Sequence, residues 1–322
     1  MVTYITRLMH RSLFVILLAM YSDALLSAPK TVNVTVMVSS ASKMYEKAVS
    51  GVKTDLSQSA DYNFNINVKN LSQDTIDSLV GLRADYIITI GSRATAEVIR
   101  RQPRVPVLSI MVAKQSYHSI RAAIKVAKPE QYSVIYLDQP AVRTFALAKI
   151  IIGKKLVNIG MLFGPTSKSK RKQYLTAAES FSMSPVEDID GTGENSIEKI
   201  KLILDSSDVY VAIYDRKALN RKTAKWLLYL ANLRRKPVIG YSSAYVDAGA
   251  LAAIYTKPLD IGHNAAKWVQ LNLKNKNTER WDTYPKLFTV NVNRKIARRL
   301  NLSIASETAL ISKIRQIESQ YE

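Results

Sequence analysis

The sequence alternates short runs of β-branched and apolar residues with amphipathic helical segments, and this alternation runs through the chain twice. Residues 32–38 and 84–90 are runs of this kind and are expected to be strands. After the first run, Met44, Ala48 and Val52 recur every fourth residue, which predicts a helix with one apolar face. Strands separated by crossover helices are typical of βαβ units and parallel sheets. The pattern therefore predicts an α/β fold.

Both halves of the chain carry a set of such elements. In the first half, we expect strands at 32–38, 64–68, 84–90 and 105–112, helices at 44–56, 72–82 and 93–101, and a linking strand at 132–137. In the second half, we expect helices at 140–152, 170–181, 196–204, 218–233, 260–273 and 295–300 and an acidic loop at 188–194. The strands of this half are expected at 156–163, 208–214, 237–241, 251–255 and 287–292, with a last helix from residue 306. The predicted architecture is two doubly wound parallel-sheet lobes joined by a hinge.

The first 28 residues have the order of a secretory signal peptide. Arg7 and Arg11 precede an apolar core at 13–21, and four small residues lie between Ser22 and Ala28. The apolar core is far shorter than the ~20 residues that a membrane-spanning helix needs, which disfavours the alternative of an uncleaved anchor. No cysteine follows the core, so a lipoprotein is excluded. We expect removal of residues 1–28 and export of the remaining protein to the periplasm.

Several kinds of chemistry are excluded by composition. Cysteine is absent and only three histidines occur, which removes thiol catalysis, iron–sulfur clusters and Cys-based or His-rich metal sites. The segment GPTSKSK at 164–170 lacks the G-K-[ST] ending of a phosphate-binding loop. His118 and His263 are expected on the surface and in helix packing, because no nucleophile motif accompanies them. The sequence therefore predicts no catalytic residue, no metal site and no cofactor.

Small, hydroxylated or aromatic residues follow several predicted strands. Ligands of parallel sheets bind outside the carboxyl ends of the strands, so these residues are candidates for binding. Hydroxyl residues at helix N-termini leave backbone N–H groups free to hold a carboxylate or phosphate, although such residues also serve as simple N-caps. Tyr45, Tyr214 and Tyr241 are placed to stack on a planar ligand. The candidate ligand-binding residues are Ser39, Ser40, Ser42, Gly91, Ser92, Asp138, Thr166, Tyr214, Asp215 and Ser242.

The chain is strongly basic, with 46 Lys and Arg against 26 Asp and Glu and a formal charge of +20. The cations cluster at 168–172, 216–236 and 294–299. The export signal and the lack of a recognition motif argue against nucleic acid as the partner. A solvated face and attraction to an anionic partner or membrane both remain open. For the loop at 168–172, the cost of desolvating four cations favours an outer face over a place in the binding site.

Three segments in the second half carry a family resemblance: YVDAGALAA at 245–253, IGHNAA at 261–266 and YPKLFTVNVNRKIARRLNLSI at 284–304. With VTVMVSSASKMYEKAVSGVKTDL, ADYIITIGSRATAEVI, KLVNIGMLFGPTS and VYVAIYD, they resemble periplasmic solute-binding proteins of ABC transporters. The group is the one of type I fold that is often labelled as binding tryptophan or tyrosine. The resemblance spans about 32–304. Two departures stand out, because Tyr214 replaces the Thr that often precedes Asp215, and GPTSKSKRKQY replaces an Asn-Pro loop.

The resemblance implies how the domains are arranged. The chain would cross between lobes near Tyr136, Ala253 and Trp281. Residues 29–136 would form the N-terminal α/β lobe, completed by about 254–280. Residues 137–253 would form the C-terminal α/β lobe, completed by about 281–322. In members of the family, loops of both lobes hold a small ligand while the lobes close.

The resemblance also implies a function, and the residues leave two readings open. The first is a non-enzymatic, periplasmic solute-binding component of an ABC transporter, which takes an amino-acid-like or organic anion ligand. The second is a sensory or accessory periplasmic binding protein that presents itself to a membrane receptor. A hydrolase is disfavoured by the missing nucleophile motifs. The expected partners are a small molecule and an inner-membrane permease, with no nucleic acid, and the protein is expected to be a monomer.

Overall fold

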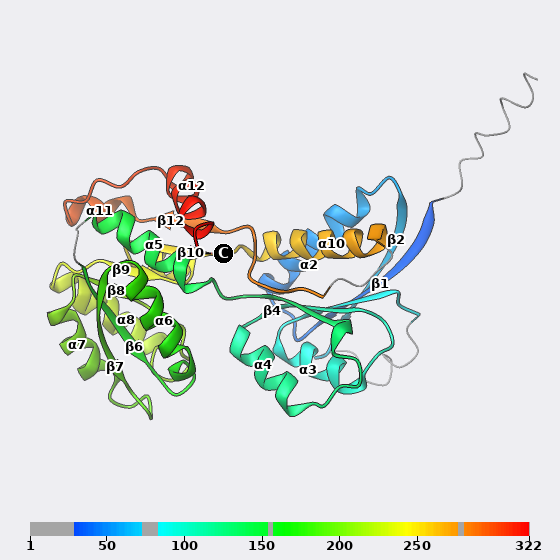
Figure 1. Cartoon of the computed structure of the whole chain (residues 1–322), viewed down its shortest axis with the longest axis horizontal. Helices are drawn as coiled ribbons and strands as arrows, with labels where there is room; N and C mark the ends of the chain where they lie inside the picture. The colour runs from blue at the N-terminus through cyan, green and yellow to red at the C-terminus, as the bar shows by residue number, and fades with distance from the viewer. Residues whose placement is uncertain (1–28, 73–82, 154–156, 276–279, 322) are drawn as a thin grey trace, which may run out of the picture.

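The computed structural model describes residues 29–72, 83–153, 157–275 and 280–321. The predicted signal peptide and nearly all of the expected helix at 72–82 lie outside these residues. Two α/β lobes follow one another along the longest axis of the molecule (Figure 1). No helix in the described ranges is long and apolar enough to cross a membrane.

The first lobe is built on a six-stranded sheet in the order β11-β5-β4-β3-β1-β2, and every pair of neighbours is parallel. Its strands are β1 (Lys30–Val38), β2 (Tyr62–Asn70), β3 (Tyr86–Ile90), β4 (Val107–Val112), β5 (Tyr132–Tyr136) and β11 (Asp282–Thr283). Its helices are α2 (Lys43–Ser57), α3 (Ser92–Arg101), α4 (Lys114–Ala123), the short η2 (Pro129–Gln131) and α10 (Pro258–Asn275). Helices α2 and α10 cover one face of the sheet, and α3 and α4 cover the other (Figure 1).

The second lobe has a six-stranded sheet in the order β12-β10-β9-β8-β6-β7. Its strands are β6 (Val157–Phe163), β7 (Met183–Ile189), β8 (Val209–Val211), β9 (Val238–Gly240), β10 (Ala252–Tyr255) and β12 (Thr289–Val292). Its helices are α5 (Ala141–Ile152), η3 (Lys168–Lys170), α6 (Arg171–Ser180), α7 (Ser196–Ser206), α8 (Arg221–Leu233), α9 (Ser243–Asp247), α11 (Arg294–Arg299) and α12 (Glu307–Glu318). The expectation of parallel strands throughout is wrong for β12, which runs antiparallel to β10.

Among the elements that the sequence pattern did not predict, α4 and β7 were missed for identifiable reasons. Helix α4 fully buries only Tyr117, and its remaining apolar contact with the core is the partly buried Ile120, so its apolar stripe is short. Strand β7 contains Pro185 and acidic residues where we expected the start of a loop. It pairs only with β6, and an edge strand tolerates a residue that has no backbone N–H. The segment expected to link the lobes, 132–137, supplies β5, a wholly buried strand of the first sheet.

Helix α10 packs on α2 although about 200 residues of chain separate them. The two backbones approach so closely that a Cβ added to Gly262 would lie 2.1 Å from the Ala48 carbonyl oxygen. One turn and a half further along, the fully buried Trp268 meets the Tyr86 ring edge-on, with 5.7 Å between ring centroids. Through this contact α10 becomes part of the first lobe, although most of the second lobe precedes α10 in the sequence.

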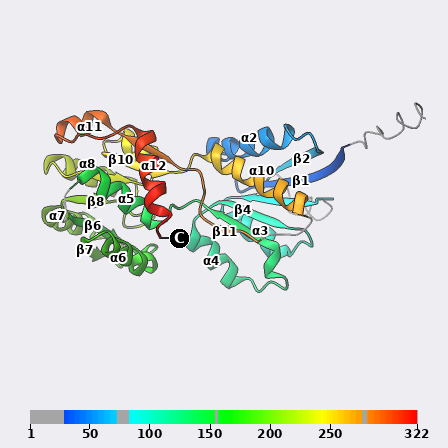
Figure 2. The same ribbon diagram turned by 45° about the horizontal axis from the view of Figure 1, so that its top comes forward.

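Three segments cross between the lobes, and one buried arginine joins them. Arg143 of α5 donates from Nη1 to Gln139 Oε1 in the first crossing (2.9 Å) and to the Pro285 carbonyl in the third (2.7 Å). Its Nε donates to Glu318 Oε2 of α12 (2.8 Å), which lies beside the crossings (Figure 2). Gln139 Nε2 in turn donates to Thr256 Oγ1 in the second crossing (2.8 Å). The hinge is therefore one connected hydrogen-bond network.

The close approach of α2 and α10 yields a stability prediction. Gly262→Ala should lower the free energy of unfolding by about 1–3 kcal/mol, because the new Cβ meets a backbone oxygen that cannot rotate away. Alanine's better helix propensity offsets only part of this cost. Urea denaturation of both proteins measures the difference.

Gly191→Ala is the matched control, because nothing lies within 4 Å of its added Cβ. We expect that variant to unfold at nearly the same urea concentration as the parent protein. Equal stability of the Gly262→Ala variant would contradict the tight helix contact.

Candidate functional site

The carboxyl edges of the two sheets border the same space, and Asp138 shows this directly. Asp138 follows β5, and its Oδ2 accepts a hydrogen bond from the backbone N–H of Lys114, which follows β4 (2.5 Å). Its Oδ1 accepts from Lys170 Nζ, which follows β6 of the second lobe (2.6 Å). Strands β4, β5 and β6 therefore end around one carboxylate. Because neighbouring strands in these parts of the sheets are parallel, both carboxyl edges face the region between the lobes.

A hinge-side pocket of about 440 Å³ lies here and takes residues from both lobes. Lys114 Nζ lies 4.9 Å from the centre of the Tyr284 ring and 5.3 Å from that of Tyr136, within the range of cation–π attraction. From the second lobe, Lys170, Gln173 and other residues of η3 and α6 complete the wall. The pocket is therefore lined by lysine, tyrosine and glutamine side chains.

A second-lobe pocket of about 610 Å³ lies at the carboxyl ends of β8 and β9. Three tyrosine rings form its apolar wall. The exposed ring of Tyr214 meets Tyr241 edge-on at 5.5 Å between centroids, and Tyr241 lies 4.7 Å from the buried Tyr245. The rings therefore run in a row from solvent to the core, where they can receive a planar group.

Polar groups complete the second-lobe pocket. Burial, followed by the effect of Tyr241, raises the pKa of Tyr245, so its hydroxyl keeps its proton at neutral pH. That hydroxyl is buried and has no hydrogen-bond partner of acceptable geometry. Asn220 caps α8 by accepting from the N–H groups of Lys222 and Thr223. Arg216, Arg221 and Lys225 supply positive charge around the opening.

Asp215 holds the loops of the second lobe together. It is fully buried, and its Oδ1 accepts from the backbone N–H groups of Lys217 (2.9 Å) and Ala218 (3.0 Å). Its Oδ2 accepts from the N–H of Thr166 (2.9 Å), whose hydroxyl accepts from the N–H of Arg216 (3.2 Å). Burial alone would raise the pKa of Asp215, but these hydrogen bonds outweigh it and lower the pKa below its ordinary value. The carboxylate is a positioning group with no free oxygen face.

In the first lobe, two of the candidate serines also have structural partners. The buried Ser39 hydroxyl donates to the Ile90 carbonyl (2.9 Å) and accepts from the N–H of Ala94 (2.9 Å). Ser42 caps α2 by accepting from the N–H of Tyr45 (3.2 Å). Gly91 has a φ of +89°, and a Cβ there would lie 2.4 Å from the Tyr45 hydroxyl oxygen. Its role is to let Tyr45 approach the backbone.

The remaining candidates have side chains that are free to meet a ligand. Ser40 and Ser92 are exposed at the ends of β1 and β3. Ser242 occupies the N-cap position of α9 without a capping hydrogen bond from its side chain. It shares the second-lobe pocket with Tyr214 and Asp215. The structure thus groups the candidates into a first-lobe wall, the hinge-side pocket and the second-lobe pocket, and their contact with a ligand stays a prediction.

Several residues of these pockets were missed at the sequence level. Lys114 is the second residue after a predicted strand, so its position was an available signal. Tyr245, Arg221 and Lys225 lie inside helices, where no strand end marks them. Tyr284 reaches the hinge-side pocket from the third crossing, 170 residues beyond Lys114. Only the folded chain shows that these side chains converge.

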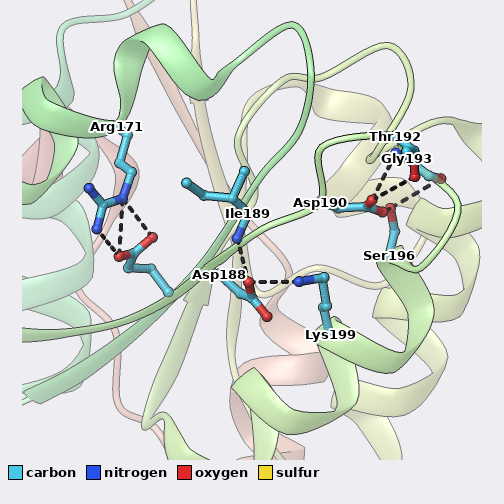
Figure 3. Close-up of polar contacts among 9 residues, drawn as sticks. Arg171, Asp188, Ile189, Asp190, Thr192, Gly193, Ser196 and Lys199 are labelled. Atoms are coloured by element: carbon cyan, nitrogen blue, oxygen red, sulfur yellow. Dashed lines mark hydrogen bonds and ion pairs between the residues drawn. The ribbon is translucent and has the colours of Figure 1, made fainter.

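The basic loop at 168–172 does not lie wholly in solvent, and that expectation is wrong for Lys170. Its ammonium group is largely buried against Asp138 in the hinge-side pocket. Arg171 pairs with Glu187 of β7 (Figure 3). Lys168 and Lys172 are exposed, as expected. The ion pairs to Asp138 and Glu187 supply the compensation that makes a partly buried cation tolerable.

The acidic residues of β7 and the loop after it are also engaged within the lobe (Figure 3). Asp188 Oδ1 accepts from Lys199 Nζ (2.7 Å). Asp190 accepts from the Ser196 hydroxyl (2.5 Å) and the Gly193 N–H (2.8 Å). Burial opposes ionisation of Asp190, but these donors hold its pKa below the ordinary value. Within the described ranges, no group of three or more Asp, Glu or His side chains is placed to hold a metal ion.

The role of Asp215 yields a pH-dependent prediction. Asp215→Asn should lower the free energy of unfolding at pH 7 by about 2 kcal/mol or more, because an amide accepts the loop N–H groups less well than a carboxylate. The folded pKa is the depressed one, so the stabilisation is present above the unfolded pKa of about 3.9 and is lost as pH falls through the folded pKa. Chemical denaturation from pH 7 to pH 3 should show the two proteins converging.

Asp188→Asn is the control, since its ion pair with Lys199 is partly exposed and is worth about 1 kcal/mol at most. Unchanged stability of the Asp215→Asn variant, together with loss of ligand binding, would instead make Asp215 a direct ligand contact.

Comparison with known proteins agrees with this geometry. The family model described as ABC transporter substrate binding protein matches residues 31–313. Among curated proteins, none matches the chain.

Three solved structures share the fold. A conserved domain protein from Vibrio cholerae is 18% identical, with a TM-score of 0.59, and the match covers 88% of this chain and 98% of the other. An ABC domain from Streptococcus pneumonia in complex with L-Trp is 17% identical, with a TM-score of 0.59 and the same two coverages. The ligand-free, open structure of a substrate-binding protein with adhesive properties from Clostridium difficile is 17% identical, with a TM-score of 0.68, covering 85% and 96%. The predicted fold class and family resemblance are confirmed.

Proposed function

Because this chain belongs to the ABC transporter substrate-binding protein family, we propose that it is the periplasmic solute-binding component of such a transporter. Its task would be to hold one small organic molecule between the lobes and deliver it to an inner-membrane permease. The observation that carries the proposal is the convergence of the carboxyl ends of β4, β5 and β6 on Asp138, since it puts the loops of both sheets around one space. Export of the chain rests on the signal-peptide pattern of residues 1–28.

The two pockets have the size and the character of small-molecule sites. Each lies within the ~300–1,000 Å³ that such sites occupy. The row of tyrosines offers an apolar platform, and the free side chains of Ser40, Ser92 and Ser242 offer hydrogen bonds from both lobes. A ligand held by both walls would favour the state in which the walls are close.

Closure would occur about the three crossings. We assign the described residues within 29–136 and 258–283 to one moving body and those within 141–255 and 289–321 to the other, following the sheets and helices that each completes. The Arg143 network ties the crossings together, so the bodies would rotate about a defined axis and stay connected. A ligand that contacts both bodies shifts the equilibrium toward the closed form by its difference in affinity for the two states.

The proposal predicts that the protein purified from the periplasm carries, or can be loaded with, one small ligand. Native mass spectrometry should show that ligand, and a free concentration of 100 Kd should add about 2.7 kcal/mol to the free energy of unfolding. A screen of amino acids and small organic anions by thermal shift measures the effect.

Tyr214→Ala should weaken the shift while leaving the ligand-free protein nearly as stable, because the Tyr214 ring is largely exposed. Tyr321→Ala is the control, as its ring is equally exposed and lies on Phe181, outside both pockets. Absence of any copurified ligand and of any shift would overturn the proposed function.

A further inference from the structure

The two pockets hold many more cations than carboxylates. Five cationic side chains line them: Lys114, Lys170, Arg216, Arg221 and Lys225. The only carboxylates among the lining residues are Asp138 and Asp215. A pocket of one sign of charge concentrates ligands of the opposite sign.

Both carboxylates already have partners within the protein. Asp138 uses Oδ2 for the Lys114 N–H and Oδ1 for the Lys170 ammonium. Asp215 is fully buried and accepts three backbone N–H bonds. An α-amino acid would bring an ammonium group that needs such an acceptor, and a buried ammonium without one is strongly disfavoured.

The cations of the second-lobe pocket, by contrast, are available. Arg216, Arg221 and Lys225 are exposed, and none of them is a member of the ion pairs found among the described residues. Arg221 and Lys225 are one helical turn apart on α8, which has no acidic residue. They lie toward the N-terminus of that helix, where the backbone dipole also favours an anion.

Tyrosine side chains form the apolar wall of the same pocket. The Tyr245 side chain is 7% exposed, and its hydroxyl is enclosed in the protein next to the Tyr241 side chain. Above it, Tyr241 and the exposed Tyr214 present ring faces and edges to a planar group.

We propose that the ligand is a ring-bearing organic anion without an ammonium group, such as an aromatic carboxylate. Its ring packs in the row of Tyr214, Tyr241 and Tyr245, and its carboxylate lies toward Arg216 and the start of α8. The assignment rests on the proposed solute-binding function and narrows its ligand class. It separates this chain from a binder of zwitterionic aromatic amino acids.

The test compares ligands that share a ring and differ in charge. L-Tryptophan is a zwitterion, indole-3-propionate is the anion without the ammonium group, and tryptamine is the cation. L-Tyrosine, 3-(4-hydroxyphenyl)propionate and tyramine form the matching phenolic set. Isothermal titration calorimetry on the periplasmic protein should give the anions at least about tenfold tighter binding than the zwitterions and no binding of the cations. The affinity for the anions should fall as salt is raised.

Variants place the anion within the pocket. Arg216→Gln combined with Lys225→Gln should weaken anion binding by about tenfold or more. Lys274→Gln, an exposed lysine on α10 of the other lobe, is the matched control and should leave it unchanged.

Glu46 provides the opposing test, because it is the exposed carboxylate in the first turn of α2, next to the candidate loop of the first lobe. Tighter binding of a zwitterion, lost in Glu46→Gln, would overturn the anion assignment and leave the solute-binding function intact. Binding of none of the six compounds would overturn the ring-bearing class, and native mass spectrometry of the copurified ligand would then decide the function separately.

Discussion

The guanidinium group of Arg143 is the interaction on which the arrangement of the lobes depends. It is 5% exposed, lies 4.4 Å from the centre of the Phe288 ring and binds Gln139, Pro285 and Glu318. A buried cation is tolerated only when partners compensate its lost hydration. The contacts of Arg143 supply this compensation together. Because Gln139 continues the network to Thr256, all three crossings are held in one geometry. The edges of both sheets, and with them both pockets, take their positions from this hinge.

The polar groups of the loops at those edges are of two kinds. Some bind other parts of the protein, and the others face the space between the lobes. Asp215 and Thr166 join the loops after β8 and β6, and Ser39 joins the end of β3 to the start of α3. These groups already have partners within the protein. What remains available is of another kind, namely exposed serines, tyrosine rings and unpaired cations. This division explains why the pockets are cationic although both sheets end near carboxylates.

Local periodicity was sufficient for most of the fold. Most strands read as continuous apolar runs because both of their faces are buried, and the amphipathic helices show an apolar period of 3.6 because each buries one face in its own lobe. It failed where an element buries little, as in α4, and where Pro185 sits on an edge strand that needs no second partner. The antiparallel direction of β12 could not be predicted from the sequence either, because a strand's own residues are compatible with either direction.

The sequence by itself determined the two α/β lobes, the absence of thiol and His-rich metal chemistry, and the strand ends at which Tyr214, Asp215 and Ser242 stand. The tertiary structure alone decided what those residues touch. Asp215 accepts a hydrogen bond from Thr166, 49 residues away in the sequence, and Asp138 pairs with Lys170, 32 residues away. Each carboxylate is therefore engaged by a residue that no local sequence pattern identifies. Burial and hydrogen bonding are properties of neighbours in space, and the fold brings those neighbours from different strands, helices and lobes.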